Sequence, residues 1–559
     1  MRLSLSFAAL LTATALSSIA PTGVQAQTDP GFDPARLSEH IRILSGDDYE
    51  GRGIATPAEA KTVKYLSEQY AAAGFQPGGD LQPDGSRLWT QGVTLNRFAV
   101  TNLEAGLKVG DWTLPLAQGQ QIVASTRLPN PSGHVMLTNA PLVFVGYGIS
   151  APERNWNDFK GMDLKGKILV VLINDADFED ASLDTFNGKA MTYYGRWTYK
   201  YEEAARQGAA GVLIVHEDAP ASYGWATVRN SWTQPQFDIE RADPSAARVP
   251  MEAWIQRDVA VQLFQHAGLD FEALKRQARS RDFQPVELPG AAFSGMFDLD
   301  QTSIQSHNVV ARLEGTTHPD ETLLYTAHWD HIGIGQPDAN GDAIFNGAVD
   351  NASGTAGLIE LARVYAAAPR TQRSIVMLSF TAEESGLLGS EYYAANPLYP
   401  LATTVGGFNM DSANVYGRTT AMSVIGAGQS DFDERITAAA AAQGRVIEPD
   451  ANTQAGYYFR SDHFPLAKQG VPMAYAESGG DFRDEPIAAR IAARDEYTNK
   501  RYHQADDEWS ADWDSGGQIE DLSIYYSIGR ALADSRDWPQ WKPASEFGPA
   551  RASSADQRK

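Results

Sequence analysis

The chain of 559 residues contains no cysteine. That absence excludes disulfide bonds, a lipid anchor on cysteine, thiol catalysis and every metal site built on thiolates. A bound metal would have to be held by His, Asp and Glu. Basic residues are also few, 46 Lys and Arg against 70 Asp and Glu, which gives a formal charge of −24. This surplus of negative charge argues against nucleic acid and anionic membrane surfaces as partners.

Long apolar runs are missing after the N-terminal segment. Residues 1–26 begin with one Arg, continue through small and apolar side chains, and end on Val24-Gln25-Ala26. This pattern is typical of a signal peptide, and we predict cleavage after Ala26 and export to the periplasm or medium of a bacterium. No other stretch is long and apolar enough to span a membrane, so we expect no integral membrane segment after cleavage.

The pattern of apolar and polar residues changes along the chain. The size of the chain favours two domains. Residues 35–75 have a helical pattern, whereas short β-like runs fill roughly 105–289. From Asn308 onward, apolar strands alternate with helices, which predicts a mostly parallel, mixed α/β sheet with helices on both faces. We therefore expect one α/β domain formed by 27–105 and 290–542, a β-rich insert at 106–289, and a disordered tail at 543–559.

Polar side chains follow several of the predicted strands. Ligands in open α/β sheets bind beyond the carboxyl ends of the strands. A lone carboxylate at such an end is more often a helix cap or a solvated turn, but a series of them indicates a shared site. Without cysteine, the donors are nitrogen and oxygen only, which suits zinc or a similar divalent ion such as cobalt or manganese. The candidates are His328, Asp330, Asp350, Glu383, Glu384, Asp411 and His503.

The charge count favours two metal ions. Asp350, Glu384 and Asp411 bring three negative charges, and two Zn²⁺ with one hydroxide between them would balance these, as +4 − 3 − 1 = 0. A single zinc would leave a buried excess of negative charge, which costs free energy. Two zinc ions ~3.5–4 Å apart can hold a water and a substrate oxygen together.

These motifs, in this order, resemble the M28 family of di-zinc exopeptidases. The resemblance covers 35–75 and 300–530 and rests on the segments "HWD", "DNASG", "EESGLLGS", "SDH" and "YH" together with Asp411. "LSGDDYEGRG" is similar to the N-terminal stretch of that family. The segments "VFVGYGISAPERNW" and "DLKGKILVVL" resemble a protease-associated (PA) domain, which many M28 enzymes carry at this point.

The resemblance implies a role for each candidate. His328 and Asp411 would bind one zinc, Glu384 and His503 the other, and Asp350 would bridge them, commonly with a cis peptide bond after it. Glu383 would be the general base, and Asp330 would orient His328, since alternate residues of a strand share a face. His331 should then point away from that face. Ser461, Asp462 and His463 would form the pocket wall behind the ligands or contact substrate, and Asp507 would support the site or its loop.

The resemblance implies a zinc metallopeptidase that hydrolyses N-terminal residues from peptides by means of a water between the metals. A zinc carboxypeptidase or dipeptidase of the same fold is the alternative, favoured if Arg460 or Arg483 lies in the specificity pocket. M20 hydrolases place their extra domain later in the chain, and the intact Glu383-Glu384 pair disfavours the mono-zinc cyclases. A binding module that has lost its metals would not need all five ligands.

Overall fold

The computed structural model describes residues 31–558 except 184, 336 and 544. The predicted signal peptide, residues 1–26, lies outside the described residues. Within the described part of the chain, none of the helices is long and apolar enough to cross a membrane.

Four parallel strands form the centre of the α/β part, which the resemblance predicts to be catalytic and which is called the catalytic part below. They are β16 (Arg373–Phe380), β13 (His318–His328), β17 (Thr404–Asn409) and β20 (Met473–Ser478), in that spatial order. Strands β12 (Val286–Leu313) and β18 (Ala421–Val424) flank them and run antiparallel to β16 and β20, respectively. The predicted mostly parallel, mixed sheet is therefore confirmed.

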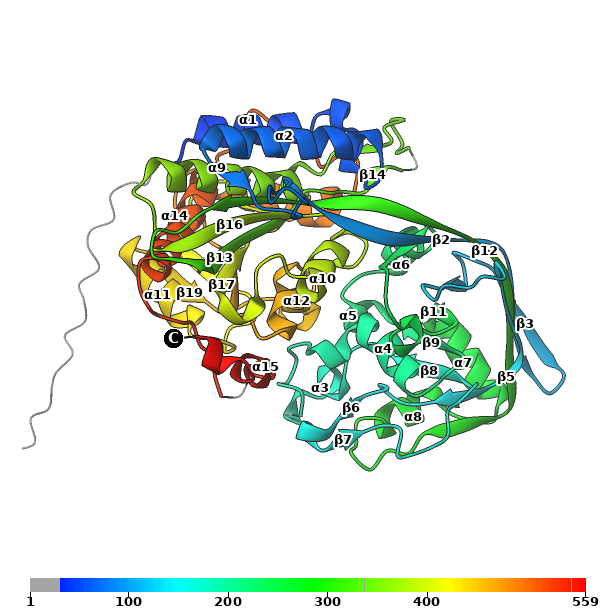
Figure 1. Cartoon of the computed structure of the whole chain (residues 1–559). Coiled ribbons are helices and arrows are strands. Elements are labelled where there is room, and N and C mark those ends of the chain that lie inside the picture. The colour runs from blue at the N-terminus through cyan, green and yellow to red at the C-terminus, as the bar shows by residue number, and fades with distance from the viewer. Residues whose placement is uncertain (1–30, 184, 336, 544, 559) are drawn as a thin grey trace, which may run out of the picture.

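Helices cover both faces of this sheet (Figure 1). Leu323, Tyr325 and Ala327 of β13 pack in one core with α1 (Pro34–Leu44), α2 (Pro57–Ala73), α9 (Gly354–Ala367), α11 (Phe432–Ala442) and α14 (Gly516–Ala533). Leu324, between them in sequence, joins the opposite core with α10 (Leu388–Ala395) and α12 (His463–Lys468). The alternation of side chains along the strand thus supplies both cores.

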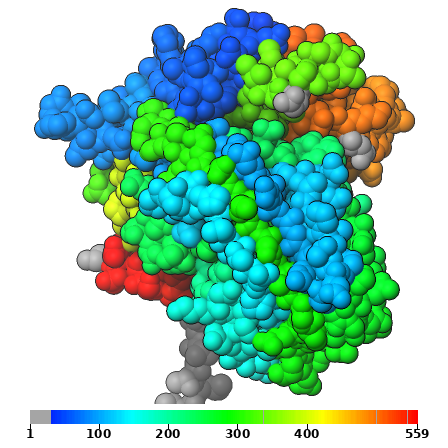
Figure 2. Space-filling model, turned by 90° about the vertical axis from the view of Figure 1, so that its right-hand side faces the viewer, coloured from blue at the N-terminus to red at the C-terminus, as the bar shows by residue number. Residues whose placement is uncertain are grey.

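The insert has its own parallel strands, β5 (His134–Phe144), β8 (Ile168–Leu172), β9 (Gly211–His216) and β11 (Met251–Gln256), and its own apolar cores. The long strands β2 (Thr90–Val109) and β12 pair antiparallel and join it to the catalytic part. In the space-filling view of Figure 2, the blue residues of β2 and the green residues of β12 lie on the face turned to the viewer. The predicted limits at 105/106 and 289/290 fall inside these two strands.

The C-terminal segment differs from its predicted disorder. Residues Gly548–Ala552 form α15, and Arg551 is buried. Its guanidinium donates to the carbonyls of Thr404 at 2.9 Å and Val405 at 3.2 Å. Hydrogen bonds to carbonyls at the start of β17, together with the packing of Phe547 against Tyr458 and Phe464, therefore hold this segment.

Candidate metal centre

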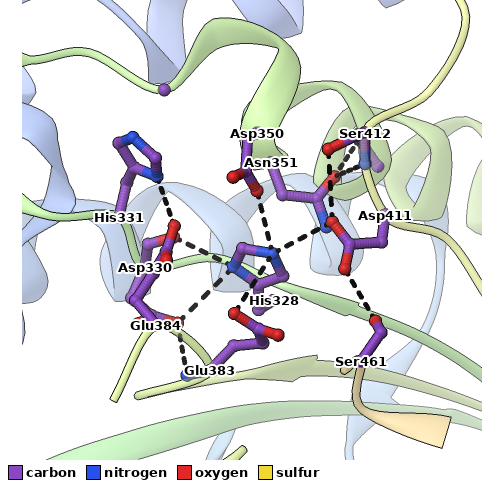
Figure 3. A network of polar contacts seen from close by, with 12 residues as sticks. His328, Asp330, His331, Asp350, Asn351, Glu383, Glu384, Asp411, Ser412 and Ser461 are labelled. Carbon is purple, nitrogen blue, oxygen red and sulfur yellow. Dashed lines mark hydrogen bonds and ion pairs between the residues drawn. The ribbon is translucent and has the colours of Figure 1, made fainter. Parts of the chain in front are cut away.

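The predicted ligands meet at the carboxyl ends of the parallel strands (Figure 3). His328 is the last residue of β13, Glu383 and Glu384 lie in the turn after β16, and Asp411 lies two residues beyond β17. Asp350 precedes α9, and His503 follows the short helix η10 (Tyr497–Arg501). Because the strands are parallel, their ends share one edge, and this brings together residues separated by up to 175 positions in the sequence.

Asp350 stands between two groups of donors. Its Oδ1 lies 3.3 Å from His328 Nε2, which is also 3.4 Å from Asp411 Oδ1. Its Oδ2 lies 3.1 Å from His503 Nε2, which is also 3.2 Å from Glu384 Oε2. Each oxygen of Asp350 thus faces a separate imidazole–carboxylate pair.

These distances fit metal coordination better than hydrogen bonding. An imidazole Nε2 carries at most one hydrogen, yet two carboxylate oxygens converge on Nε2 of His328 and two on that of His503. Tetrahedral ligands at ~2.0–2.1 Å from zinc are separated by about 3.4 Å, close to the observed 3.1–3.4 Å. The donor set could therefore hold a cation on each side of Asp350.

The electrostatics of Asp350 and Glu383 diverge. Burial acts to raise the pKa of Asp350, but hydrogen bonds from His328 and His503 hold that pKa well below its usual range. Burial raises the pKa of Glu383 well above its usual range, and the charges of Asp411 and Glu384 add to this against the opposing effect of His328. Two carboxylates of one site thus differ in proton affinity, as acid–base chemistry requires.

Asp330 holds both His328 and the turn that carries Glu383. The backbone carbonyl of Asp330 lies 3.1 Å from His328 Nδ1, closer than its carboxylate at 3.7 Å. Its Oδ1 accepts a hydrogen bond from the backbone N–H of Glu383 at 3.1 Å. The position of His328 therefore depends first on the carbonyl of Asp330, and the carboxylate of Asp330 fixes the Glu383 backbone.

His331 does not point away from the site, contrary to the expectation from strand alternation. Its ring is buried, and Nδ1 lies 2.6 Å from Glu384 Oε1. Atoms of His331, Asp350 and Glu384 also lie close enough together to hold a metal ion. The expectation was wrong because β13 ends at His328, and the alternation of faces ends with the strand.

Asp507 and Arg52 hold the backbone around Asp350 in place. Asp507 accepts hydrogen bonds from the backbone N–H groups of Val349 at 3.0 Å and Asp350 at 3.1 Å. The buried Arg52 donates to the carbonyls of Trp329 at 2.8 Å and Gly347 at 2.7 Å. It thereby ties the segment after β13 to the segment before Asp350, where the following peptide bond is cis. Sequence reasoning missed Arg52, although it lies in the "YEGRG" segment that carried part of the resemblance.

The "RSDH" segment forms a wall behind Asp411. Ser461 donates to Asp411 Oδ2 at 2.7 Å and accepts from Asn409 at 2.7 Å. Asp462 is buried, and burial raises its pKa to about 7. His463 packs between the rings of Tyr458 and Tyr475, at 4.7 and 5.2 Å between centroids. Of these three residues, Ser461 is the one that forms a hydrogen bond with a candidate ligand.

A cleft of about 1900 Å³ opens onto this centre between the catalytic part and the insert. The insert contributes Arg196 and Tyr223, and the catalytic part contributes Arg460, Glu477 and the candidate ligands. The Arg460 guanidinium stacks 5.7 Å from the Tyr223 ring, so the two parts touch across the cleft. Of the aromatic segment 191–201, Tyr193 and Trp197 reach the lining.

The fold and this donor set define an α/β protein with a candidate metal centre at the carboxyl ends of its strands. Residues 308–527 match the model of peptidase family M28. The aminopeptidase from Aneurinibacillus sp. strain AM-1 shares the fold, with a TM-score of 0.51 at 20% identity. That alignment covers 92% of this chain and 95% of the other, so it includes the insert.

Curated relatives match over shorter stretches. Aminopeptidase NAALADL1 of Rattus norvegicus is 35% identical over 293 residues, 43% of this chain and 37% of the relative. A probable zinc metalloprotease of Pyrenophora teres f. teres is 43% identical over 109 residues, 20% of this chain and 22% of the relative. The chain thus spans between about a fifth and two fifths of these curated relatives.

Proposed function

We propose that this protein is an exported zinc-dependent exopeptidase that removes N-terminal residues from peptides. The observation that carries the proposal is Asp350, whose two oxygens face two separate imidazole–carboxylate pairs. The match of residues 308–527 to the M28 model and the names of the curated relatives support zinc and peptide-bond hydrolysis. The signal-like N-terminal sequence supports export.

His328 and Asp411 would hold one zinc, Glu384 and His503 the second, and Asp350 would reach both. When bound there, zinc supplies Lewis acidity that polarises the scissile carbonyl and acidifies the attacking water. His331 lies against Glu384 and would fix the direction of its carboxylate. A second hydrogen-bonding partner of this kind orients metal ligands in many metalloenzymes.

Glu383 would move the proton in this reaction. Its Oε2 lies 4.0 Å from His328 Nε2 and so faces the donors without joining either pair. It would take a proton from the attacking water and deliver it to the nitrogen of the leaving amine. The Asp330 carboxylate would keep Glu383 in place through the Glu383 backbone N–H.

A carboxypeptidase or dipeptidase is the second candidate, and a pair of arginines favours it. Arg196 of the insert and Arg460 line the cleft, and neither forms an ion pair with a carboxylate of the described residues. Burial lowers the pKa of Arg196 to about 9, with the nearby Arg460 adding to that effect. Two close guanidinium groups without an anion suit the carboxylate end of a short peptide.

Zinc analysis and a small substrate panel test both candidates. We expect about two zinc ions per chain and hydrolysis that a chelator abolishes and added zinc restores. Cleavage of N-free, C-blocked dipeptides supports the aminopeptidase, whereas cleavage of N-blocked peptides with a free carboxylate supports the carboxypeptidase. A purified protein without zinc and without chelator-sensitive hydrolysis would contradict both candidate functions.

A further inference from the structure

Glu477 lines the cleft from β20, on the same edge of the sheet as the metal centre. Parallel pairing aligns Tyr475 of β20 with Asn409 of β17. Asp411 lies two residues beyond the end of β17, and Glu477 lies two residues beyond Tyr475 in β20, so both are near the carboxyl ends of neighbouring strands. Glu477 therefore lies beside the first coordination group and outside it.

The carboxylate of Glu477 has one hydrogen-bond donor, the Tyr475 hydroxyl at 2.6 Å from Oε1. The two side chains can meet because they lie two positions apart on one strand face. No lysine, arginine or histidine in the described part of the chain forms an ion pair with Glu477. Burial, with the charges of Asp411, Asp450 and Asp521, raises the pKa of the Glu477 carboxyl to about 7 against the hydrogen bond from Tyr475.

The other carboxylates on this side of the cleft have partners within the chain. Asp521 pairs with Arg445 at 2.6 Å, and Asp495 pairs with Arg494 at 3.1 Å. Asp450 accepts a backbone N–H at 2.7 Å. Glu477 is thus the carboxylate of this wall that faces other anions and the open cleft. A partly buried anion among anions is stabilised by a cation that enters from solvent.

We propose that Glu477 is a specificity-determining residue that binds an ammonium or guanidinium group of the substrate beside the reacting centre. The proposal rests on the proposed peptidase function. The cation has two possible sources in a peptide, the free α-amino terminus or a Lys or Arg side chain. Either cation would donate a charge-assisted hydrogen bond to the Glu477 carboxylate, which the Tyr475 hydroxyl orients.

The kinetics of Glu477→Gln distinguish the α-amino terminus from a Lys or Arg side chain as the source of the bound cation. The substrates are Leu-Ala, Lys-Ala and the desamino analogue of Leu-Ala, which lacks the α-ammonium group. Loss of one charge-assisted bond should lower kcat/KM about 10- to 100-fold, mainly through KM. If the α-ammonium is bound, both dipeptides lose equally and the preference over the desamino analogue shrinks. If the side chain is bound, the loss is confined to Lys-Ala.

Two further variants keep the test specific. Glu477→Asp, which retains the charge, should recover part of the lost activity. Asp495→Asn removes a charge from the rim of the same cleft and should change KM less than twofold. Equal kcat/KM for wild type and Glu477→Gln, on both dipeptides and with zinc content and melting temperature unchanged, overturns the proposal for Glu477.

The outcome for Glu477 is separable from that for the peptidase function. If the wild type hydrolyses none of the substrates, the peptidase function fails. Calorimetric binding of free leucine and lysine then reports on the subsite directly: weaker binding of either to Glu477→Gln supports an ammonium site, and equal binding of both contradicts it.

Discussion

Buried charge is balanced differently in the insert and in the metal centre. In the insert, Asp238 binds the guanidinium groups of Arg241 and Arg248 at 2.8 and 2.7 Å. Arg127 and Glu252 form a buried pair with contacts of 2.8 and 3.2 Å. Each of these two buried anions has a cation of the same chain beside it, and the pKa of Asp238 falls to about 2 against the effect of burial.

In the candidate metal centre, carboxylates surround imidazoles that carry too few hydrogens to form a hydrogen bond with each of them. Four carboxylates, those of Asp350, Glu383, Glu384 and Asp411, surround the rings of His328 and His503. An unpaired buried charge is costly, so a region that retains such a surplus needs a counter-ion from outside the chain. Compared with these two pairs of the insert, the candidate metal centre is distinguished by carboxylates that converge on imidazoles with too few hydrogens, more than by burial itself.

Removing the shared ligand should have the largest effect. Asp350→Asn takes away the group that both donor pairs share, so we expect loss of both zinc ions and of chelator-sensitive hydrolysis to background. Inductively coupled plasma mass spectrometry of the purified variant and a peptide assay check this. Glu252→Gln, which alters a buried carboxylate of the insert, is the control and should keep both ions. Full zinc content in Asp350→Asn would contradict Asp350 as the bridge.

Glu383→Gln should keep the metals and lose turnover. The amide retains the shape of the side chain but cannot accept the proton, so kcat should fall by ~10²–10⁴ or more. Stopped-time assays with metal analysis on the same sample measure both quantities. Turnover within tenfold of the wild type would remove Glu383 from the proton-transfer role.

Regular strands made the sheet and the neighbourhood of the site predictable. Apolar runs such as 323–325 are continuous because both faces of a central parallel strand are buried. The polar residues that follow these runs meet because parallel strands end at one edge. His328, Asp350, Glu384, Asp411 and His503 are thus brought together by topology that the strand–helix alternation already indicates.

Features that depend on distant backbone could not be predicted in this way. His331 lies beyond the end of β13, where no periodicity governs direction. Arg52 and Arg551 act through carbonyls up to 295 positions away, and a sequence pattern carries no sign of that pairing. The insert boundaries were placed where the composition changes, whereas β2 and β12 run on through both parts.

Breaking a balanced pair in the insert should cost stability and leave chemistry intact. Glu252→Gln leaves the Arg127 guanidinium buried without its anion, and we expect a loss of about 3–5 kcal/mol in the free energy of unfolding. Chemical denaturation measures this loss, and zinc content serves as the internal control. The double variant Arg127→Met, Glu252→Leu should recover most of the stability. A loss of zinc in Glu252→Gln would contradict the separation of the two regions.

The smallest effect concerns His463, a buried ring of the catalytic part that has no charge partner. Burial lowers its pKa from 6.5 to about 3, so the folded protein keeps the ring neutral where the unfolded chain binds a proton. The unfolded state then gains protons as the pH falls below 6.5, and stability falls with it. Between pH 6.5 and 4 this contribution amounts to about 3 kcal/mol.

His463→Phe keeps a ring between Tyr458 and Tyr475 and removes the titration. The variant should therefore lose less stability than the wild type as the pH is lowered from 6.5 to 4, measured by denaturant unfolding at each pH. Parallel slopes for wild type and His463→Phe would show that the ring is charged in the folded protein. A buried charge without a partner would then exist in the catalytic part, and a surplus of buried charge would no longer single out the metal centre.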